Sequence, residues 1–476
     1  MRESFFFYDL ETTGRDPRWH RIVQFAGVRT DAAFEPIDEP VSLLARPDDD
    51  VVPEPEALLV TGLAPEDWAA GVDERALFRR MDAEFSRPRT TVAGYNNLRF
   101  DDEFVRHGLW RTLHDPYARE WQGGNARWDL IDLARMAAAL RPEGVVWPAR
   151  EGRRSFRLED LAAANGIEQV RAHDAVADVL ATVGLARRLR EAQPRLVEFH
   201  LGLRAKRVVA ELLLPLLHAP CVHVSGRYAA PHTALVAAVA MHPVNRNSVL
   251  VADLGADPET WCALAPEVLR ETLFAPAAKL GDRIRPPLKE VHVNRVPAVA
   301  PLAVLRAEDA DRLGLDPELA QRRLEQLRAV PDLAARVSAC YERPPRPPCE
   351  DVAGALYDGF LPDGDRRALT ELRGADAATL AAPPPLEDAR ARELAFEHLA
   401  RVFPEALDEA GRGRFAARVR DRLAHGRDGM RPLPAVCAEL EARLDGASGD
   451  AAAERVLRGL RDHLAALSAR WRIDAA

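Results

Sequence analysis

The chain has 476 residues, 47% of them hydrophobic, so it is long enough to form two or three domains, each with its own core. Its apolar runs, such as residues 233–241, are far shorter than the roughly 20 residues of a membrane-spanning helix, and residues 1–10 do not resemble a secretory signal. The five cysteines are scattered without a CxxC pair, which argues against a zinc ribbon or a disulfide framework. We therefore expect a cytoplasmic protein with no membrane association.

The net charge of −9 does not by itself indicate a protein that binds nucleic acid, although a sum over the whole chain conceals local patches. Only three of the 65 basic residues are lysine, which we attribute to a composition bias. Basic residues outnumber acidic ones from Arg187 to Arg207. Such a run is ordinarily a solvated helix face.

The first part of the chain predicts an α/β domain over residues 1–195. Its apolar and alternating segments indicate three strands, a helix, a fourth strand and then more helices. Strands mixed with helices in this way are typical of a sheet covered by helices. The predicted strands are 5–11, 21–30, 41–46 and 91–96, and the predicted helices are 74–85, 101–113, 128–140, 157–165 and 173–191.

Two further domains follow. Segments 221–229, 233–243 and 248–254 are strand-like and separated by turn residues, so residues 196–345 predict a small antiparallel sheet or barrel with attached helices. Residues 342–351 are rich in proline and predict a semi-rigid linker. The remainder, 350–476, has the pattern of an all-helical domain.

Two acids end the apolar run at the start of the chain. Asp9 and Glu11 stand two positions apart on a predicted strand, so their carboxylates point to the same face. Like charges this close repel unless a cation lies between them or one group stays protonated. A divalent metal such as Mg²⁺ or Mn²⁺, which prefers oxygen ligands, would neutralise both. The alternative is an acid pair at a solvent-facing strand edge.

Two later segments supply further acids. Residues 95–104 place Asp101 and Asp102 in the first turn of a helix, where acids also favour the helix dipole. Asp178 lies five residues after His173 on an otherwise apolar helical face, and a buried acid there needs a partner. Spacing alone does not choose between Asp101 and Asp102.

The order of these residues, D-x-E, then D, then H-x4-D, resembles the DEDDh 3′→5′ exonucleases of the RNase H-like superfamily. A narrower resemblance, to the bacterial exonuclease I family, rests on blocks spread over the whole chain: YNNLRFDDE, DPYAREWQGGNARWDLIDLARMAAALRPEG, SFRLEDLAAANGI, AHDAVADV, HVSGRY, HPVNRN, YDGFL and ARVFPEALD. It implies an RNase H-like exonuclease domain at 1–195, an SH3-like domain at 196–345 and a helical C-terminal domain at 350–476. The activity it implies is 3′→5′ hydrolysis of single-stranded DNA to 5′-mononucleotides, in DNA repair and recombination.

The resemblance also implies roles for particular residues. The catalytic set is Asp9, Glu11, Asp102, His173 and Asp178, with His173 as the general base. The four acids would hold two Mg²⁺ ions, with Mn²⁺ possible, and it is the resemblance that selects Asp102 over Asp101.

Further residues are implied to bind the substrate, although each could equally be an ordinary surface residue. They are Glu11, Thr12, His107, Gln122, Arg157 and Lys206. The motif ETTG departs from exonuclease I, where an aromatic residue commonly follows the first threonine. We expect this difference to alter the packing against the terminal base and to leave the metal ligands unchanged.

The implied partners are single-stranded DNA and the acidic C-terminal tail of single-stranded DNA-binding protein, with Arg141 as a carboxylate contact and the protein acting as a monomer. One alternative is a proofreading exonuclease or oligoribonuclease, but such enzymes are about the size of the first domain alone. A second is a single-strand-binding protein without catalysis, which the presence of all five motif residues disfavours. A third is a metal-dependent phosphatase for small nucleotides, whose activity would be insensitive to salt.

Overall fold

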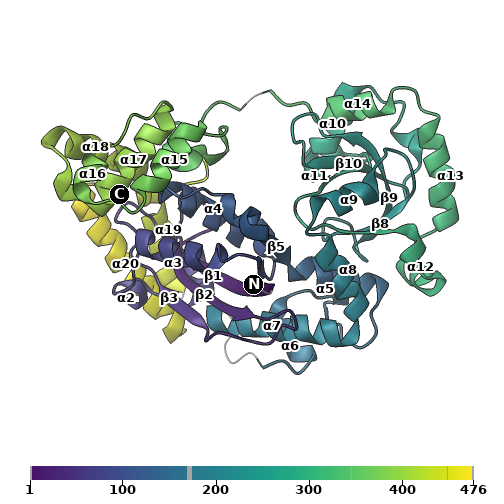
Figure 1. The fold of residues 1–476 in the computed structure, drawn as a ribbon, viewed down its shortest axis with the longest axis horizontal. Helices are drawn as coiled ribbons and strands as arrows, with labels where there is room; N and C mark the ends of the chain where they lie inside the picture. The colour runs from purple at the N-terminus through teal and green to yellow at the C-terminus, as the bar shows by residue number, and fades with distance from the viewer. Residues whose placement is uncertain (1–2, 169–173, 345, 447–448, 474–476) are drawn as a thin grey trace. The chain divides into compact units, whose positions relative to one another are not determined.

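The structure, a computed structural model, describes residues 3–168, 174–344, 346–446 and 449–473 (Figure 1). They form two compact units. The first unit combines residues from 1–126, 169–180 and 347–476, and the second combines residues from 127–168 and 181–346. The C-terminal residues thus belong to the same compact unit as the N-terminal strands.

The first sheet has the strand order β3-β2-β1-β4-β5. β1 pairs antiparallel with β2 and parallel with β4. It is apolar without alternation because both of its faces are buried: Phe6 and Tyr8 belong to one core cluster, whereas Phe5 and Phe7 pack edge-on against Phe34. The strands are β1 (Ser4–Thr12), β2 (Ile22–Thr30), β3 (Val41–Leu44), β4 (Thr90–Gly94) and β5 (Ala126–Asp129).

The helices of this segment largely follow the sequence pattern. They are α1 (Pro55–Thr61), α2 (Pro65–Trp68), α3 (Glu74–Phe85) and α4 (Asp101–Arg111). The helix predicted to start at Trp128 is an exception, since Trp128 and Asp129 belong to β5 and α5 (Leu130–Leu140) begins only afterwards. The Asp129 side chain accepts a hydrogen bond from the backbone N–H of Ile131 and so caps the helix.

The C-terminal helices complete the core of the first unit, where Figure 1 shows them beside the first sheet. Trp19 and Trp68 share one buried cluster with Val419 and Leu460, and a second cluster joins Trp110 to residues 352–407. These helices are α15 (Asp363–Leu372), α16 (Ala377–Ala381), α17 (Ala389–Val402), α18 (Glu409–His425), α19 (Leu433–Gly446) and α20 (Ala451–Trp471). Without them the N-terminal segment would expose large apolar side chains to water.

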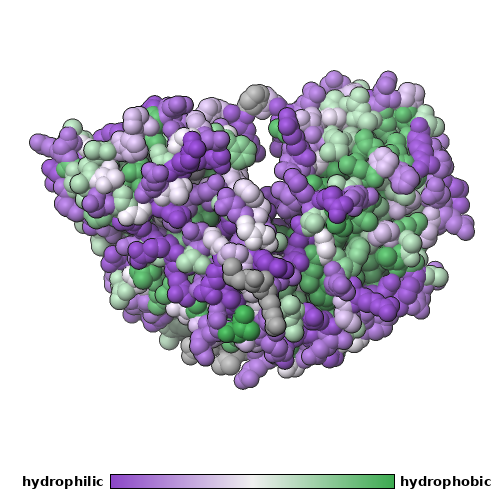
Figure 2. Space-filling model, in the orientation of Figure 1, coloured by the Kyte–Doolittle hydropathy of each residue, from purple (hydrophilic) through white to green (hydrophobic). Residues whose placement is uncertain are grey.

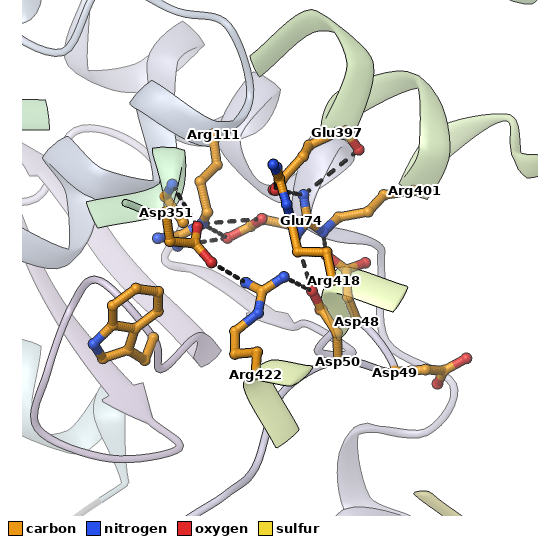
Figure 3. Close-up of polar contacts among 12 residues, drawn as sticks. Asp48, Asp49, Asp50, Glu74, Arg111, Asp351, Glu397, Arg401, Arg418 and Arg422 are labelled. Atoms are coloured by element: carbon orange, nitrogen blue, oxygen red, sulfur yellow. Dashed lines mark hydrogen bonds and ion pairs between the residues drawn. The ribbon is translucent and has the colours of Figure 1, made fainter. Parts of the chain in front are cut away.

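A buried network of charges joins the same two segments (Figure 3). Asp50 Oδ2 lies 2.8 Å from Arg401 Nη2 and 3.2 Å from Arg422 Nη2, and Arg401 also pairs with Glu397 at 2.8 Å. Burial by itself raises the pKa of Asp50, but the guanidinium groups of Arg401 and Arg422 outweigh it and hold that pKa below its ordinary value. Asp50 is therefore a charged link between the loop after β3 and helices α17 and α18.

The second unit contains an antiparallel sheet with the order β11-β10-β9-β8-β12, so the small antiparallel sheet predicted there is confirmed. Its strands are β8 (Cys221–Val224), β9 (Thr233–Met241), β10 (Ser248–Asp253), β11 (Leu288–His292) and β12 (Ala298–Pro301). The last two were not indicated by the sequence pattern. Met136 and Leu140 of α5 belong to the core of this sheet.

The remaining helices border this sheet or precede it. They are α6 (Leu158–Ala164), α7 (Ala175–Ala192), α8 (Pro194–Gly202), α9 (Lys206–Leu213), α10 (Pro266–Phe274), α11 (Ala277–Leu280), α12 (Ala307–Leu313), α13 (Pro317–Arg328) and α14 (Leu333–Cys340). A short hairpin of β6 (Ala149–Arg150) and β7 (Arg153–Arg154) precedes α6. Hydrophilic residues cover much of the visible surface of both units (Figure 2). Among the described residues, no helix has the combination of length and hydropathy that a bilayer crossing requires.

The substitution Asp50→Asn tests the buried network, because it removes the charge while keeping the shape of the side chain. It leaves the guanidinium groups of Arg401 and Arg422 close together without the carboxylate that neutralises them. We expect the free energy of unfolding of the first unit to fall by about 3–5 kcal/mol. Denaturant unfolding followed by tryptophan fluorescence measures this change.

The matched control is Asp363→Asn. Asp363 forms an ion pair with Arg366 at the surface, and its side chain is 81% exposed. Exposed pairs of this kind contribute about 0–1 kcal/mol, so the control should unfold almost as the unsubstituted protein does. If both substitutions lower the free energy of unfolding by equal, small amounts, the buried network does not contribute to stability as predicted.

Candidate active site and family

Three carboxylates converge at the end of β1. Asp9 and Glu11 lie opposite Ala26 and Gln24 of β2, and the register shifts between Glu11 and Thr12. Asp178 comes from the first turn of α7. One ligand oxygen from each of these three acids lies within 4.8 Å of the other two. The structure therefore brings together three of the four predicted metal ligands, in the spacing that a cation with oxygen ligands requires.

The environment of these acids disfavours their negative charge. Burial raises the pKa of Asp9 to about 8, with a further contribution from the charge of Asp178. Burial likewise raises the pKa of Glu11 to about 9, followed by the charges of Asp9, Asp178 and Asp174. Carboxyl groups held this close need a positive partner to be ionised together at neutral pH. A divalent cation fits this donor set.

The fourth predicted ligand, Asp102, has different partners. Its side chain is fully buried, and Oδ1 accepts hydrogen bonds from the Tyr8 hydroxyl at 3.0 Å and from Arg119 Nη2 at 2.8 Å. Asp102 is thus already neutralised by a buried guanidinium. The structure does not support Asp102 as a metal ligand. The sequence did not indicate the role of Arg119, because nothing in the spacing connects it with Asp102.

The pKa of Asp101, at the start of α4, is affected by the acids of the cluster. Burial raises its pKa well above the ordinary value, and the next largest cause is the negative charge of Asp9, with a smaller contribution from Glu11. Asp101 thus interacts electrostatically with these acids, and no contribution from Arg119 is among the causes of its shift. Of the two acids that spacing left open, Asp101 is thus the one whose pKa responds to the charge of Asp9.

The other predicted site residues have varied surroundings. The predicted base, His173, lies outside the described residues. The hydroxyl of Thr12 is buried and donates to the carbonyl of Gly14 at 2.8 Å. Arg157 precedes α6, forms an ion pair with Glu159 and keeps half of its side chain exposed. Gln122 is exposed, as is Lys206 at the first position of α9.

His107 does not fit its predicted contact with nucleic acid. It is 2% exposed, its ring lies edge-on to Tyr357, and Nδ1 is 3.4 Å from the carbonyl of Ala353. Burial lowers its pKa to about 3, so it is neutral at physiological pH. The predicted role was wrong because the C-terminal segment covers this histidine, which the local sequence does not reveal.

Family models describe nearly all of the chain. Residues 6–186 match the model described as Exonuclease, residues 204–343 the Exonuclease I SH3-like domain, and residues 350–467 the Exonuclease I C-terminal domain. The sequence is 41% identical to exodeoxyribonuclease I of Escherichia coli (strain K12) over 425 residues, which cover 87% of this chain and 89% of that relative. The chain belongs to the exodeoxyribonuclease I family. It is therefore an exonuclease, a phosphodiester hydrolase.

Solved structures agree with this family. Exonuclease I of Methylocaldum szegediense, described as moderately thermophilic, matches with a TM-score of 0.92 and 44% identity, covering 98% of this chain and 99% of that chain. The zinc-bound complex of Escherichia coli exonuclease I with single-stranded DNA matches with a TM-score of 0.92 and 38% identity, covering 98% and 100%. The predicted family and the predicted fold class, an RNase H-like exonuclease domain with SH3-like and helical C-terminal parts, are confirmed.

The raised pKa values of Asp9 and Glu11 predict how the stability of this family member depends on pH. In the metal-free folded state these groups keep protons up to about pH 8 and 9, whereas in the unfolded chain they release them near ~4. The folded state holds more protons within this window, so its stability falls as pH rises from about 5 to 9. We expect melting temperatures in EDTA to fall accordingly, and Mg²⁺ to raise them most at the alkaline end.

Asp9→Asn isolates this effect from every other titrating group, because it removes one carboxyl from the cluster without altering its size. In EDTA the variant should gain melting temperature relative to the unsubstituted protein as pH rises, and in Mg²⁺ this advantage should shrink. Parallel melting curves of the two proteins across the window would contradict the clustering of the acids.

Proposed function

We propose that this protein is a single-strand-specific exodeoxyribonuclease that removes 5′-mononucleotides from the 3′ end, acting as a cytoplasmic monomer in DNA repair and recombination. The observation that carries the proposal is the partly buried cluster of Asp9, Glu11 and Asp178 in a chain matched over most of its length by exodeoxyribonuclease I. The Escherichia coli enzyme has been solved with single-stranded DNA and bound zinc. We extend both to this protein, with single-stranded DNA as its substrate and a divalent metal as its cofactor.

In this proposal Asp9, Glu11, Asp101 and Asp178 hold two divalent ions, Mg²⁺ or else Mn²⁺. The donor set supports this assignment, since all four groups are carboxylates and at least three of them repel one another when charged. When bound, the ions would activate water and stabilise charge on the leaving 3′ oxygen. Asp102, with Arg119 and Tyr8, instead fixes the start of α4 from which Asp101 projects.

The remaining roles belong to side chains of the chain itself. His173 accepts the proton of the attacking water, a task for which an imidazole pKa near ~6.5 is suited at neutral pH. Arg157 and Lys206 contact backbone phosphates, and their exposure supports this. Thr12, directly after the acids of β1, stays as a contact to the terminal nucleotide, and the exposed Gln122 stays as a contact along the DNA path. His107 is withdrawn from the substrate because Ala353 and Tyr357 cover it.

A pair of neighbouring substitutions tests both the function and the ligand set. The unsubstituted protein should release nucleotides from 3′-labelled single strands in Mg²⁺, and far more slowly from duplexes or in EDTA. Asp101→Asn should lower this rate by at least about 10²-fold and abolish the rise in melting temperature on adding Mg²⁺. Asp102→Asn should lower the melting temperature, because Arg119 loses its partner, yet keep the response to Mg²⁺.

Binding of a 3′-blocked single strand in EDTA serves as the control for folding, and all three proteins should retain it. If the unsubstituted protein degrades duplexes as fast as single strands, the proposed specificity is wrong. If Asp102→Asn loses the Mg²⁺ response and Asp101→Asn keeps it, the roles of the two acids are reversed.

The proposed protein partner is the acidic tail of single-stranded DNA-binding protein, which would meet Arg141. This guanidinium is 30% exposed, donates to the carbonyl of Val304 at 3.1 Å and lies 3.7 Å from Asp309. Arg306 shares the same carboxylate at 2.6 Å. Arg312 also pairs with Asp309 at 2.7 Å, and Arg306 pairs in addition with Glu143 and Glu308. Arg141 is thus the arginine of this group whose guanidinium lies farthest from Asp309. A peptide carboxylate would find bidentate donors there.

A fluorescent peptide with the acidic tail tests this partner by anisotropy at low salt. We expect Arg141→Gln to weaken binding by about tenfold, since a hydrogen bond between charged groups contributes roughly 1.5–3 kcal/mol. Arg322→Gln removes an exposed charge from α13 and is the matched control. No binding to the unsubstituted protein, or equal loss in both variants, would reject the site.

A further inference from the structure

The β6–β7 hairpin carries a concentration of positive charge. It borders a pocket of about 590 Å³ in the second unit. Five arginines line this pocket, together with a single acid, Glu151; they are Arg135, Arg150, Arg153, Arg154 and Arg157. The hairpin turn is tight, because Glu151 and Gly152 have φ values of 51° and 75°, as a two-residue type I′ turn requires. The arginines are therefore held on a short, defined scaffold.

Arg150 and Arg153 are the unusual pair of this hairpin. They lie directly opposite each other, so both side chains project from the same face. Like charges in this arrangement destabilise a hairpin, and neither guanidinium has a hydrogen bond or ion pair to any residue in the described part of the chain. Arg154, in the neighbouring pair, instead donates to the carbonyl of Ala138 at 2.8 Å. An anion between Arg150 and Arg153 would remove their repulsion.

The rest of the pocket offers groups that suit a nucleotide. The guanidinium of Arg135 lies 5.8 Å from the ring centre of Phe156, and His232 meets the same ring edge-on at 6.1 Å. The Nε of Arg135 is buried and lacks a hydrogen-bond partner among the described residues. Aromatic faces beside cationic groups are typical of surfaces that bind single strands, because bases stack while phosphates meet the charges.

We infer that Arg150 and Arg153 form a phosphate clamp for the backbone of single-stranded nucleic acid, beside the surface of Phe156. This inference rests on the proposed function and deepens it by assigning a further part of the substrate track. The competing occupant is an acidic peptide. The adjoining aromatic rings favour nucleic acid, since a peptide carboxylate needs the arginines alone.

The test compares Arg150→Gln/Arg153→Gln with the unsubstituted protein in EDTA, using anisotropy of a labelled deoxythymidine oligonucleotide over a series of salt concentrations. Each phosphate contact contributes about 0.7 to the slope of log affinity against log salt for single strands. The double variant should therefore lose about 1.4 of this slope and bind about 25-fold more weakly at 0.1 M salt. Arg150→Lys/Arg153→Lys should keep most of the slope. In Mg²⁺ the glutamine variant should show a raised KM and an unchanged kcat.

The matched control is Arg322→Gln/Arg328→Gln on α13, which removes the same charge from the same unit. Equal losses in the two double variants would overturn the clamp, as would an unchanged slope in the hairpin variant. Loss of binding to an acidic peptide but not to the oligonucleotide would also overturn it. If the unsubstituted protein degrades single strands in Mg²⁺ and the hairpin variant has the same affinity, salt slope and KM, only this inference fails. If the unsubstituted protein neither binds nor degrades them, the proposed function fails as well.

Discussion

Repulsion between carboxylates is the constraint around which the first unit is built. Asp9, Glu11 and Asp178 each place a ligand oxygen within 4.8 Å of the others, with Glu11 buried and the other two partly buried. The unfolded chain would not hold these carboxylates together. The fold imposes this arrangement, since two of the acids lie on β1, which is buried on both faces, and the third lies in the first turn of α7. The cluster is therefore stable only as far as the surrounding packing outweighs its electrostatic cost. A site of this kind is prepared for a cation before one binds.

The same need for support explains why α4 is fixed at both ends. At its start, Asp102 is held by Arg119 and Tyr8. At its end, Arg111 forms an ion pair with Glu74 at 2.7 Å. Glu74 also forms an ion pair with Arg21, and the charge of Asp50 acts in turn on Arg21. The C-terminal helices reach this chain of charges through Arg401 and Arg422. They thus connect through ion pairs with the residues that hold the end of α4, although Arg401 lies 290 residues after Arg111 in the sequence.

The sequence revealed those features that depend on neighbouring residues. The apolar run before Asp9 predicted a buried strand, and the acids at its end predicted a cation site. It failed where a distant segment decides the outcome. Asp101 and Asp102 share one helical turn, and Arg119 and Tyr8, which bind Asp102, distinguish the surroundings of the two acids. His107 looked accessible because its cover comes from residues 353–357.

The net charge raises the question of how an acidic chain can bind a polyanion. The 65 basic and 74 acidic residues largely neutralise each other, and many arginines are committed to carboxylates, as Arg401 and Arg422 are to Asp50. A committed guanidinium offers little field to a phosphate, so total charge and arginine content do not measure affinity. What matters is where guanidinium groups lack acidic partners. The hairpin of Arg150 and Arg153 is such a place, since folding brings two like charges face to face there.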